Sequence, residues 1–546
     1  MAAKSIRHRI PVSLRHYWKL IAGSIGLIAV LTLVVGTVRA TALVYSDANE
    51  GFVVTNDIQG TVDLFDTSVA HEISLSYSDA DYEEMKEEFE DSGEKGWIKA
   101  DITIDGVTIA DVGIRLKGNS TLQALGGGMT MGGDGEEGGG FPGGGEMPEG
   151  MELPEGMEMP EGGEMPEGMG GMGGGTGTSI SFDSPEGLPW LIDFSKYVDG
   201  QVYQGNQQIS LRVESAMGGT EGGSLSEAVS LQLIEASGES TYDWNYSTVS
   251  VNGSEGVTRR VVDIMDVTWA EDEYGENAGV LYKALSTGSF EYQGEDPDDY
   301  SDDFKQVSME GSADVQPLVD FLKWLDEADD ETFDAELGDW VDIESFANYT
   351  ALQNLLTNGD DMAGPGKNFY LWYDYETKLI SVVTWDVDLT LQTADLAPED
   401  TASLGGGGGF AGQEETEATT EEGAAAEEGA TEEQAAADDT GQRGERPAGG
   451  AGGDAEGGMG GMGGGNALKE RFLASEAFQD EYMAAYNELY DSLFASGAAL
   501  ESLETAQAAA ELNGADVSAS AESLKAIIQQ RTEYLAEALS TDPAAG

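Results

Sequence analysis

The stretch of the 546-residue sequence that is richest in possible catalytic and metal-binding residues runs from Asn358 to Asp388. It reads NGDDMAGPGKNFYLWYDYETKLISVVTWDVD. Its hard oxygen ligands suit magnesium or calcium rather than zinc. Magnesium usually completes its shell with water and substrate phosphates, so this set of residues points to phosphoryl transfer. The alternative is structural, with aspartates capping a turn and ending a strand in a very acidic chain. The candidate ligands are Asp360, Asp361, Asn368, Asp386 and Asp388.

The elements expected around this stretch bring its two ends together. Ser345–Leu356 has the apolar spacing of a helix and ends just before the paired aspartates. Phe369–Trp372 and Leu379–Trp385 are typical of two hairpin strands. Asn368 precedes the first strand and Asp386 follows the second. Because hairpin strands are antiparallel, we expect these two side chains at the same end of the hairpin.

The charge and composition exclude several kinds of protein. The chain has 26 Lys and Arg against 103 Asp and Glu, a net charge of −77, so nucleic-acid binding is excluded by repulsion from the phosphates. The absence of cysteine excludes disulfides, thiolate metal sites and cysteine catalysis. Of the three histidines, only His71 lies beyond the basic N-terminus. Only this histidine is therefore available for a histidine-based triad or a zinc site.

The N-terminus has the pattern of a membrane anchor. A basic segment, residues 1–19, precedes an uncharged apolar run from Leu20 to Val38, which is long enough to cross a bilayer as a helix. The positive-inside rule keeps the basic segment in the cytoplasm and exports the rest. The small residues after Arg39 are compatible with signal-peptide cleavage, but the length of the run favours an uncleaved anchor. We therefore expect a single-pass cell-membrane protein with an extracytoplasmic C-terminal domain.

Two low-complexity inserts interrupt the remaining chain. Residues 125–178 are rich in Gly, Met and Glu and contain near-copies of the unit GEMPEG. Residues 397–465 form an acidic Gly/Ala/Glu run with few large apolar residues. Neither composition provides enough apolar surface for a packed core, so both inserts are expected to be disordered.

The folded material is then predicted in three pieces, 60–122, 179–395 and 466–542. Strands come early and helices late, which indicates an α+β protein with a sheet-rich first lobe and a helical second lobe. The predicted strands are His71–Ser78, Trp97–Ile104, Val107–Leu116, Ile209–Val213, Thr248–Val251 and Arg259–Met265. The other predicted helices are Asp79–Glu90, Ser226–Ala236, Val315–Ala328, Ala467–Phe494 and Val517–Leu539.

Five motifs together resemble those of a known family. They occur in the order seen in the spore-coat CotH kinase-like family, and the resemblance spans roughly 70–395 and 466–495. It implies an atypical protein-kinase-like, two-lobed fold that uses ATP and a divalent cation to phosphorylate proteins. The motifs are Arg115–Thr121 (RLKGNST), Val280–Lys283 (VLYK), Asn358–Tyr373 (NGDDMAGPGKNFYLWY), Trp385–Asp388 (WDVD) and Asn466–Leu473 (NALKERFL).

The resemblance also implies roles for single residues. Asp360, with Asp361 as the alternate, would accept the proton of the substrate hydroxyl. Asn368 and Asp386 would hold the metal, with Asp388 supporting them. The cofactors implied are ATP and Mg²⁺, with Mn²⁺ or Ca²⁺ as alternatives, and the partners are a nucleotide and a protein substrate. The nucleotide-binding candidates are Arg115, Lys117, Lys283 and Asp263.

A second function stays open from the sequence. The stretch Leu188–Phe194 carries no cation, where many relatives of that family have a lysine. Asp263 also stands where the family has the longer glutamate. These departures favour a catalytically inactive CotH-like module that binds partners at the cell surface or envelope.

Overall fold

The structure is a computed structural model that describes residues 52–118, 122, 125, 180–213, 225–402 and 465–541. The predicted anchor at 20–38 and most of the predicted inserts at 125–178 and 397–465 lie outside these residues. Within the described ranges, no helix is both long and apolar enough to span a membrane. The boundaries of the three pieces of the kinase-like domain remain predictions.

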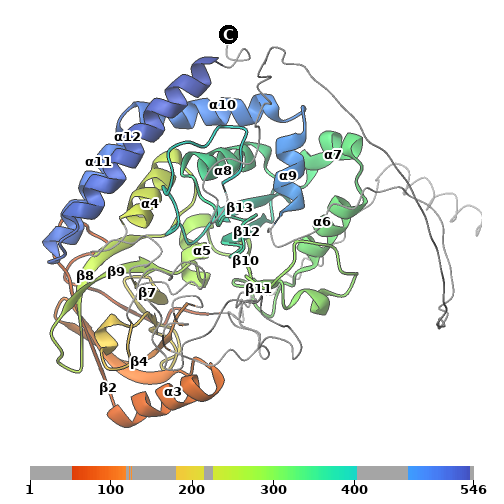
Figure 1. Cartoon of the computed structure of the whole chain (residues 1–546). Helices are drawn as coiled ribbons and strands as arrows, with labels where there is room; N and C mark the ends of the chain where they lie inside the picture. The colour runs from red at the N-terminus through yellow and green to blue at the C-terminus, as the bar shows by residue number, and fades with distance from the viewer. Residues whose placement is uncertain are drawn as a thin grey trace, which may run out of the picture. The chain divides into compact units, whose positions relative to one another are not determined.

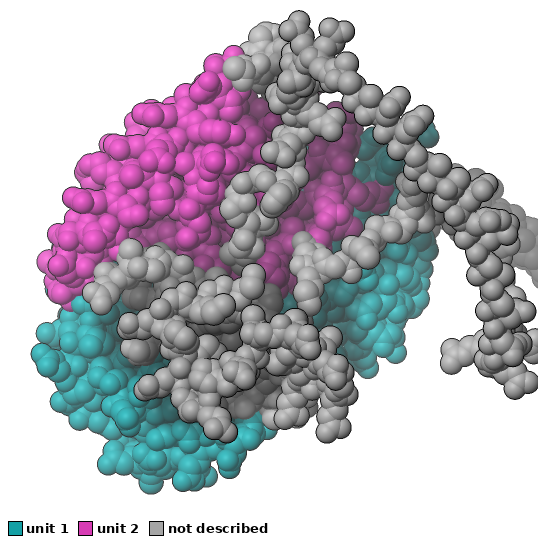
Figure 2. Space-filling model, viewed as in Figure 1, with its two compact units in different colours: residues 1–213, 242–346, 370–383 teal, residues 214–241, 347–369, 384–546 magenta. Residues whose placement is uncertain are grey.

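The chain divides into two compact units, which Figure 2 shows in different colours. Unit 1 comprises Met1–Val213, Tyr242–Phe346 and Tyr370–Val383. Unit 2 comprises Glu214–Thr241, Ala347–Phe369 and Thr384–Gly546.

A closed seven-stranded β-barrel forms the core of unit 1 (Figure 1). Around the barrel the strand order is β2-β3-β4-β5-β7-β9-β8, and the parallel pairing of β2 with β8 closes it. Inward-facing side chains such as Ile73, Ile102 and Ile114 are buried in its apolar interior. The strands are β2 (Glu72–Tyr77), β3 (Ile98–Ile104), β4 (Val107–Leu116), β5 (Trp190–Asp193), β7 (Gln208–Arg212), β8 (Trp244–Val251) and β9 (Val257–Asp263).

The β3–β4 hairpin is confirmed, together with the turn that joins its strands. Asp105 has a φ of 48° and Gly106 a φ of 83°, the left-handed conformation that tight hairpin turns favour and that Asp and Gly tolerate. Buried and exposed residues alternate along β3, from buried Ile98 to buried Ile104. This alternation is what the sequence pattern predicted for a strand with one face in a core.

His71 lies beside this turn and has a structural role there. Its Nδ1 lies 2.7 Å from Asp105 Oδ2, and its Nε2 lies 3.1 Å from the carbonyl oxygen of Asp66. Asp105 also accepts a hydrogen bond from the backbone N–H of Glu72, at 2.9 Å. The imidazole therefore fastens the start of β2 to the β3–β4 turn.

The remaining elements of unit 1 include helix α3 on the barrel, a four-stranded sheet and a two-stranded sheet of β1 and β6. Helix α3 (Asp79–Ser92) is capped by Ser78, buries Tyr82, Met85 and Phe89, and packs on β3. The four-stranded sheet has the order β11-β10-β12-β13, so the predicted hairpin of β12 and β13 is confirmed. The elements are β1 (Asn56–Ile58), β6 (Gln201–Tyr203), β10 (Gly279–Ala284), β11 (Phe304–Gln306), β12 (Phe369–Asp374), β13 (Ile380–Thr384), α5 (Val267–Tyr274), α6 (Gln316–Glu327) and α7 (Asp330–Glu336).

Unit 2 is mainly helical. Helix α11 packs against both α4 and α12, as Figure 1 shows, and α4 is buried along most of its length. The protein is thus a mixed α+β structure with a seven-stranded barrel and a helical C-terminal part, which confirms the predicted α+β class. The helices are α4 (Ser226–Ser237), α8 (Ile343–Leu355, in unit 2 from Ala347), α9 (Ala467–Ala474), α10 (Gln479–Leu489), α11 (Ala498–Leu512) and α12 (Ser518–Thr541).

The prediction of one helix over Ala467–Phe494 was wrong. The chain leaves the helix at Ser475, whose φ of −82° and ψ of 125° are extended, and α10 then starts a new helix. The Ser475 hydroxyl accepts a hydrogen bond from Ala477 N–H at 3.1 Å, which competes with helical hydrogen bonding. The rings of Phe472 and Phe478 stack at 5.1 Å across the break and fix it.

Candidate functional site

The loop that follows α8 in unit 2 holds Asp360 in a buried, hydrogen-bonded position. Asn358 accepts a hydrogen bond from Asp360 N–H at 3.1 Å and donates one to Gln353 at 2.8 Å. The Asp360 carboxylate accepts from Gly366 N–H at 2.5 Å and from the Asn368 amide at 3.0 Å. The loop therefore fixes both oxygens of Asp360 and joins this residue directly to Asn368.

The surroundings of Asp360 make its carboxylate unusually basic. Burial raises the pKa of Asp360 to about 6, and the charges of Asp386 and Asp361 act in the same direction. The hydrogen bonds from Gly366 and Asn368 oppose the rise. A carboxylate of this pKa is ionised at neutral pH and accepts a proton more readily than an ordinary aspartate, as a general base requires.

Asp361 has a different environment. Its side chain forms a buried ion pair with Lys469 of α9, and it accepts a hydrogen bond from Ala363 N–H at 2.9 Å. Asn466 caps α9 and so positions Lys469 at the start of the helix. Because the charge of Asp361 is matched inside the protein, the geometry favours Asp360 as the proton acceptor.

Asn368 and Asp386 offer oxygens of the type that magnesium prefers. The Asn368 amide nitrogen donates to Asp360, so its amide oxygen is the atom that can coordinate a cation. Asp386 is close enough to Asp360 for its charge to raise the pKa of Asp360. The Asp388 carbonyl accepts a hydrogen bond from Ser226 of α4 at 3.1 Å, which holds this segment on the helix.

No three His, Cys, Asp or Glu side chains in the described part of the chain form a group that could hold a metal ion by themselves. A magnesium site of phosphoryl transfer takes few protein ligands and is completed by phosphate oxygens and water. The amide and carboxylate oxygens found here fit that type of site. The metal-binding roles of Asn368, Asp386 and Asp388 stay predictions.

Backbone strain marks the same region. Asp386 has a φ of 55°, and the left-handed conformation also occurs at Thr357, Lys367 and Leu391, with φ of 50°, 49° and 54°. Such a conformation costs roughly 1–3 kcal/mol for each non-glycine residue and persists only where surrounding contacts impose it. Strained residues of this kind cluster at functional sites, which supports a functional reading of these loops.

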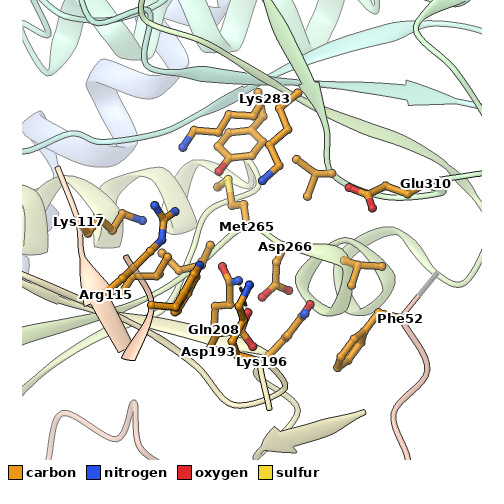
Figure 3. Close-up of a pocket in the computed structure, with 18 of the residues that line it drawn as sticks. Phe52, Arg115, Lys117, Asp193, Lys196, Gln208, Met265, Asp266, Lys283 and Glu310 are labelled. Carbon is orange, nitrogen blue, oxygen red and sulfur yellow. Dashed lines mark hydrogen bonds between the residues drawn. The ribbon is translucent and has the colours of Figure 1, made fainter. Parts of the chain in front are cut away.

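A cationic pocket lies in unit 1. Its cavity has a volume of about 270 Å³, and Figure 3 shows Arg115 beside Lys117 and, from another strand, Lys283. Five of the chain's 26 Lys and Arg residues line it, although the net charge is −77. Concentrated positive charge in a concave site attracts anions such as phosphates. The five cations are Arg115, Lys117, Lys196, Lys283 and Lys305.

The structure brings three of the four predicted nucleotide-binding residues to this pocket: Arg115, Lys117 and Lys283. Asp263 is instead buried at the end of β9 and does not line the cavity. Its carboxylate accepts from Ile264 N–H at 2.7 Å, and burial raises its pKa well above the usual value. Asp263 is therefore a poor stand-in for an ionised glutamate.

Sequence reasoning missed Lys196 and Lys305 in the pocket, and Lys469 beside the catalytic candidates. Lys196 follows β5, the strand without a cation, and Lys305 belongs to β11. Pairing of β5 with β4 and of β11 with β10 places them near the predicted cations. Lys469 lies in the motif Asn466–Leu473, whereas the scarcity of cations in so acidic a chain was the only sequence signal for Lys196 and Lys305.

The pocket also contains carboxylates. Asp193 accepts from Ser195 N–H at 2.8 Å, from the Ser195 hydroxyl at 2.7 Å and from the Gln208 amide at 2.8 Å. Asp266 caps α5 by accepting from Thr268 N–H at 2.9 Å and from Trp269 N–H at 3.3 Å. Burial raises the pKa of Asp266 to about 7.

Comparison with known proteins identifies the family. A comparison of the sequence with curated proteins finds no match. A comparison with protein families matches residues 184–537 to the family described as CotH kinase protein. The matched region contains Lys283, Asp360 and Lys469, and it starts after Arg115 and Lys117. Since this match covers nearly two thirds of the sequence, the chain belongs to the CotH kinase protein family.

Proposed function

We propose that this protein is a metal-dependent kinase that transfers the γ-phosphoryl group of ATP to a hydroxyl group of a protein or a small molecule. Membership in the CotH kinase protein family supports ATP as the phosphoryl donor and Mg²⁺ as the metal. The observation that carries the proposal is the buried Asp360 carboxylate, with a pKa of about 6 and a hydrogen bond to Asn368.

The residues of unit 2 have separate tasks in this reaction. Asp360 accepts the proton as the substrate oxygen bonds to the γ-phosphorus and the bond from that phosphorus to ADP breaks. Asn368 orients Asp360 with its amide nitrogen and, with Asp386, offers oxygens to the cation. Mg²⁺, or Mn²⁺ or Ca²⁺ in its place, would neutralise charge on the phosphates. Lys469 keeps the charge of Asp361 paired.

The cationic pocket of unit 1, taken by itself, is suited to bind the phosphates of a nucleotide. The chain as a whole repels ATP, because its net charge is −77. Arg115, Lys117 and Lys283, with Lys196 and Lys305, provide a local positive field that offsets this repulsion. The lysine absent from residues 188–194 is thus compensated by cations from other positions.

We also propose that residues 20–38 form an uncleaved membrane anchor, with the kinase-like domain outside the cell and cell-envelope proteins as substrates. The uncharged apolar run and the five basic residues before it support this location. Mass spectrometry of membrane-extracted protein should detect peptides from before Ala40. Protein released into the medium with a new N-terminus at Ala40–Leu43 would contradict it.

A thermal-shift experiment on the full chain tests the kinase proposal. ATP with Mg²⁺ should raise the melting temperature well beyond ATP or Mg²⁺ alone, because a ligand that binds only the native state stabilises it. Asp386→Ala should abolish the additional shift from Mg²⁺. The control Glu376→Ala removes an exposed carboxylate in the turn between β12 and β13 and should behave as the wild type.

The same experiment addresses the inactive alternative. A catalytically inactive interaction module would show no Mg²⁺-dependent stabilisation by ATP. Equal melting curves with and without ATP and Mg²⁺, in the wild type and in Asp386→Ala, would contradict the kinase proposal.

A further inference from the structure

The cationic pocket of unit 1 is also lined by apolar and acidic side chains, some of which come from the segment between β9 and α5. Met265 and Asp266 from this segment line the same cavity as the five cations. Figure 3 labels both residues together with Arg115, Lys117, Lys196 and Lys283. Apolar side chains line the cavity as well: Leu191, Ile264, Val267, Leu285 and Val307. A ligand that fills the cavity therefore meets positive charge, apolar surface and a carboxylate.

One carboxylate oxygen of Asp266 accepts no hydrogen bond within the part of the protein that the structure describes. Oδ1 accepts the hydrogen bonds that cap α5, including one from the Thr268 hydroxyl at 2.8 Å. Oδ2 is buried and accepts no hydrogen bond from any residue that the structure describes. The residue as a whole is only 8% exposed. A buried acceptor without a donor costs free energy and is rare in native proteins, so a donor is expected from outside the chain.

Asp193 provides the contrast within the same pocket. Its two oxygens accept hydrogen bonds from Ser195 and Gln208, so its carboxylate is satisfied without a ligand. Glu310 also lines the cavity but is exposed to solvent. Asp266 is thus a buried pocket carboxylate with an oxygen left for recognition.

We infer that Asp266 determines nucleotide specificity, with Oδ2 accepting a hydrogen bond from an N–H or O–H donor on the nucleoside part of the bound nucleotide. The inference rests on the proposed function and deepens it. A purely anionic ligand such as tripolyphosphate satisfies the cations but has no donor for Oδ2. A nucleotide satisfies both, because it joins phosphates to a nucleoside that carries base N–H groups and sugar hydroxyls.

Asp266→Asn is the sharpest test of this role. The amide oxygen can still cap α5, while the amide nitrogen takes the place of Oδ2 and turns an acceptor into a donor. The matched control is Asp272→Asn, which removes an exposed carboxylate from the same helix without changing the pocket. Asp266→Ser, which keeps a capping oxygen and lacks a second one, repeats the test should the Asn variant fold poorly.

Calorimetric titration of the full chain with the Mg²⁺ complexes of ATP and of tripolyphosphate gives the readout. The titrations are run at about pH 8.5, where a carboxyl group of pKa about 7 is ionised. Loss of a hydrogen bond to this charged acceptor should weaken ATP binding at least about tenfold in Asp266→Asn. Tripolyphosphate should bind the wild type and this variant equally. Asp272→Asn should match the wild type with both ligands.

Three analogues identify the donor: 2′-deoxyATP, 3′-deoxyATP and purine riboside triphosphate, which lacks the adenine amine. The analogue without the recognised group should bind the wild type as weakly as ATP binds Asp266→Asn.

Two results would overturn the inference, and they are distinguishable. If the wild type binds ATP and Asp266→Asn binds it equally well, Asp266 does not recognise the nucleoside, and the proposed function stands. If the wild type binds neither ATP nor tripolyphosphate, the proposed function fails and the inference fails with it.

Discussion

Asp360 and Asp361 are neighbours in the chain but have opposite electrostatic environments. Asp361 is buried against the ammonium group of Lys469. Asp360 is held by the neutral donors Gly366 and Asn368, and burial raises its pKa to about 6. Two adjacent carboxylates thereby become suited to different tasks, one to structure and one to proton transfer.

The raised pKa of Asp360 predicts a pH-dependent cost in stability. Below about pH 4 the carboxyl group is protonated in both the native and the unfolded state. Between about pH 4 and pH 6 the native state keeps a proton that the unfolded chain has lost, so stability falls as pH rises, by about 3 kcal/mol in full. Asp360→Asn removes this titration and retains an oxygen for Gly366 N–H.

Urea unfolding at several pH values checks this prediction. Asp360→Asn should match the wild type near pH 4 and exceed its stability by about 2–3 kcal/mol above about pH 6. A constant difference between the two proteins over this range would contradict the prediction. Kinase activity of the wild type should rise with pH through about 6, because the base must be ionised.

The pair of Lys469 and Asp361 predicts a strongly non-additive double-mutant cycle. Lys469→Met leaves the Asp361 carboxylate buried without its counter-ion, which should cost about 3–5 kcal/mol in the free energy of unfolding. Adding Asp361→Asn removes that isolated charge and should recover most of the loss. Chemical denaturation of the two single variants and the double variant measures the coupling. A double variant no more stable than Lys469→Met would refute this account of the pair.

At the scale of elements, Arg531 of α12 holds together the segments next to the candidate site in unit 2. The guanidinium is fully buried and donates to the carbonyls of Asn354 at 3.0 Å, Leu355 at 3.4 Å and Ala394 at 3.2 Å, and also to Leu396. One side chain thus joins α12 to the end of α8 and to the segment that follows Asp388.

Arg531→Met should therefore destabilise unit 2 strongly. It leaves several buried carbonyls without donors, and we expect a loss of about 3–5 kcal/mol. Arg531→Lys should recover only part of it, because an ammonium group lacks the planar fork of donors. Hydrogen exchange should show faster exchange at 394–402. Lys525→Met, at an exposed position of the same helix, is the control, and equal stability of the two Met variants would contradict the prediction.

Local patterns predicted most of the elements that position the site. The alternation in β3, the Asp105-Gly106 turn and the β12–β13 hairpin follow from short-range rules. Closure of the barrel by β2 and β8 does not follow from such rules, because those strands are far apart in sequence.

Features that depend on tertiary packing escaped prediction. The break at Ser475 is fixed by a side-chain hydrogen bond and a stacked pair of rings. The grouping of Lys196 and Lys305 with Arg115 depends on strand order. The pairing of Lys469 with Asp361 joins residues 108 positions apart. Periodicity and composition carry no information about such long-range neighbours.

At the scale of the whole molecule, the two inserts predict tolerance to deletion. Residues 126–178 and 403–464 are too poor in large apolar side chains to stabilise a core, so removing either should leave the melting temperature within about 2 °C of the wild type. Deleting 126–178 should also strengthen ATP binding at low salt, since it removes negative charge from the chain. Calorimetric melts and titrations check both effects. A drop of many degrees would show that the deleted residues belong to the folded core.

The proposed reaction is transfer of the γ-phosphoryl group of ATP with Asp360 as the base. The most direct measurement follows ADP release and label incorporation from ATP labelled in its γ-phosphoryl group, with Mg²⁺, for the wild type, Asp360→Asn and Glu376→Ala. The account predicts that Asp360→Asn binds ATP but releases ADP at least about a hundredfold more slowly than the wild type, while Glu376→Ala matches the wild type. ADP release by the wild type no faster than by Asp360→Asn would contradict it.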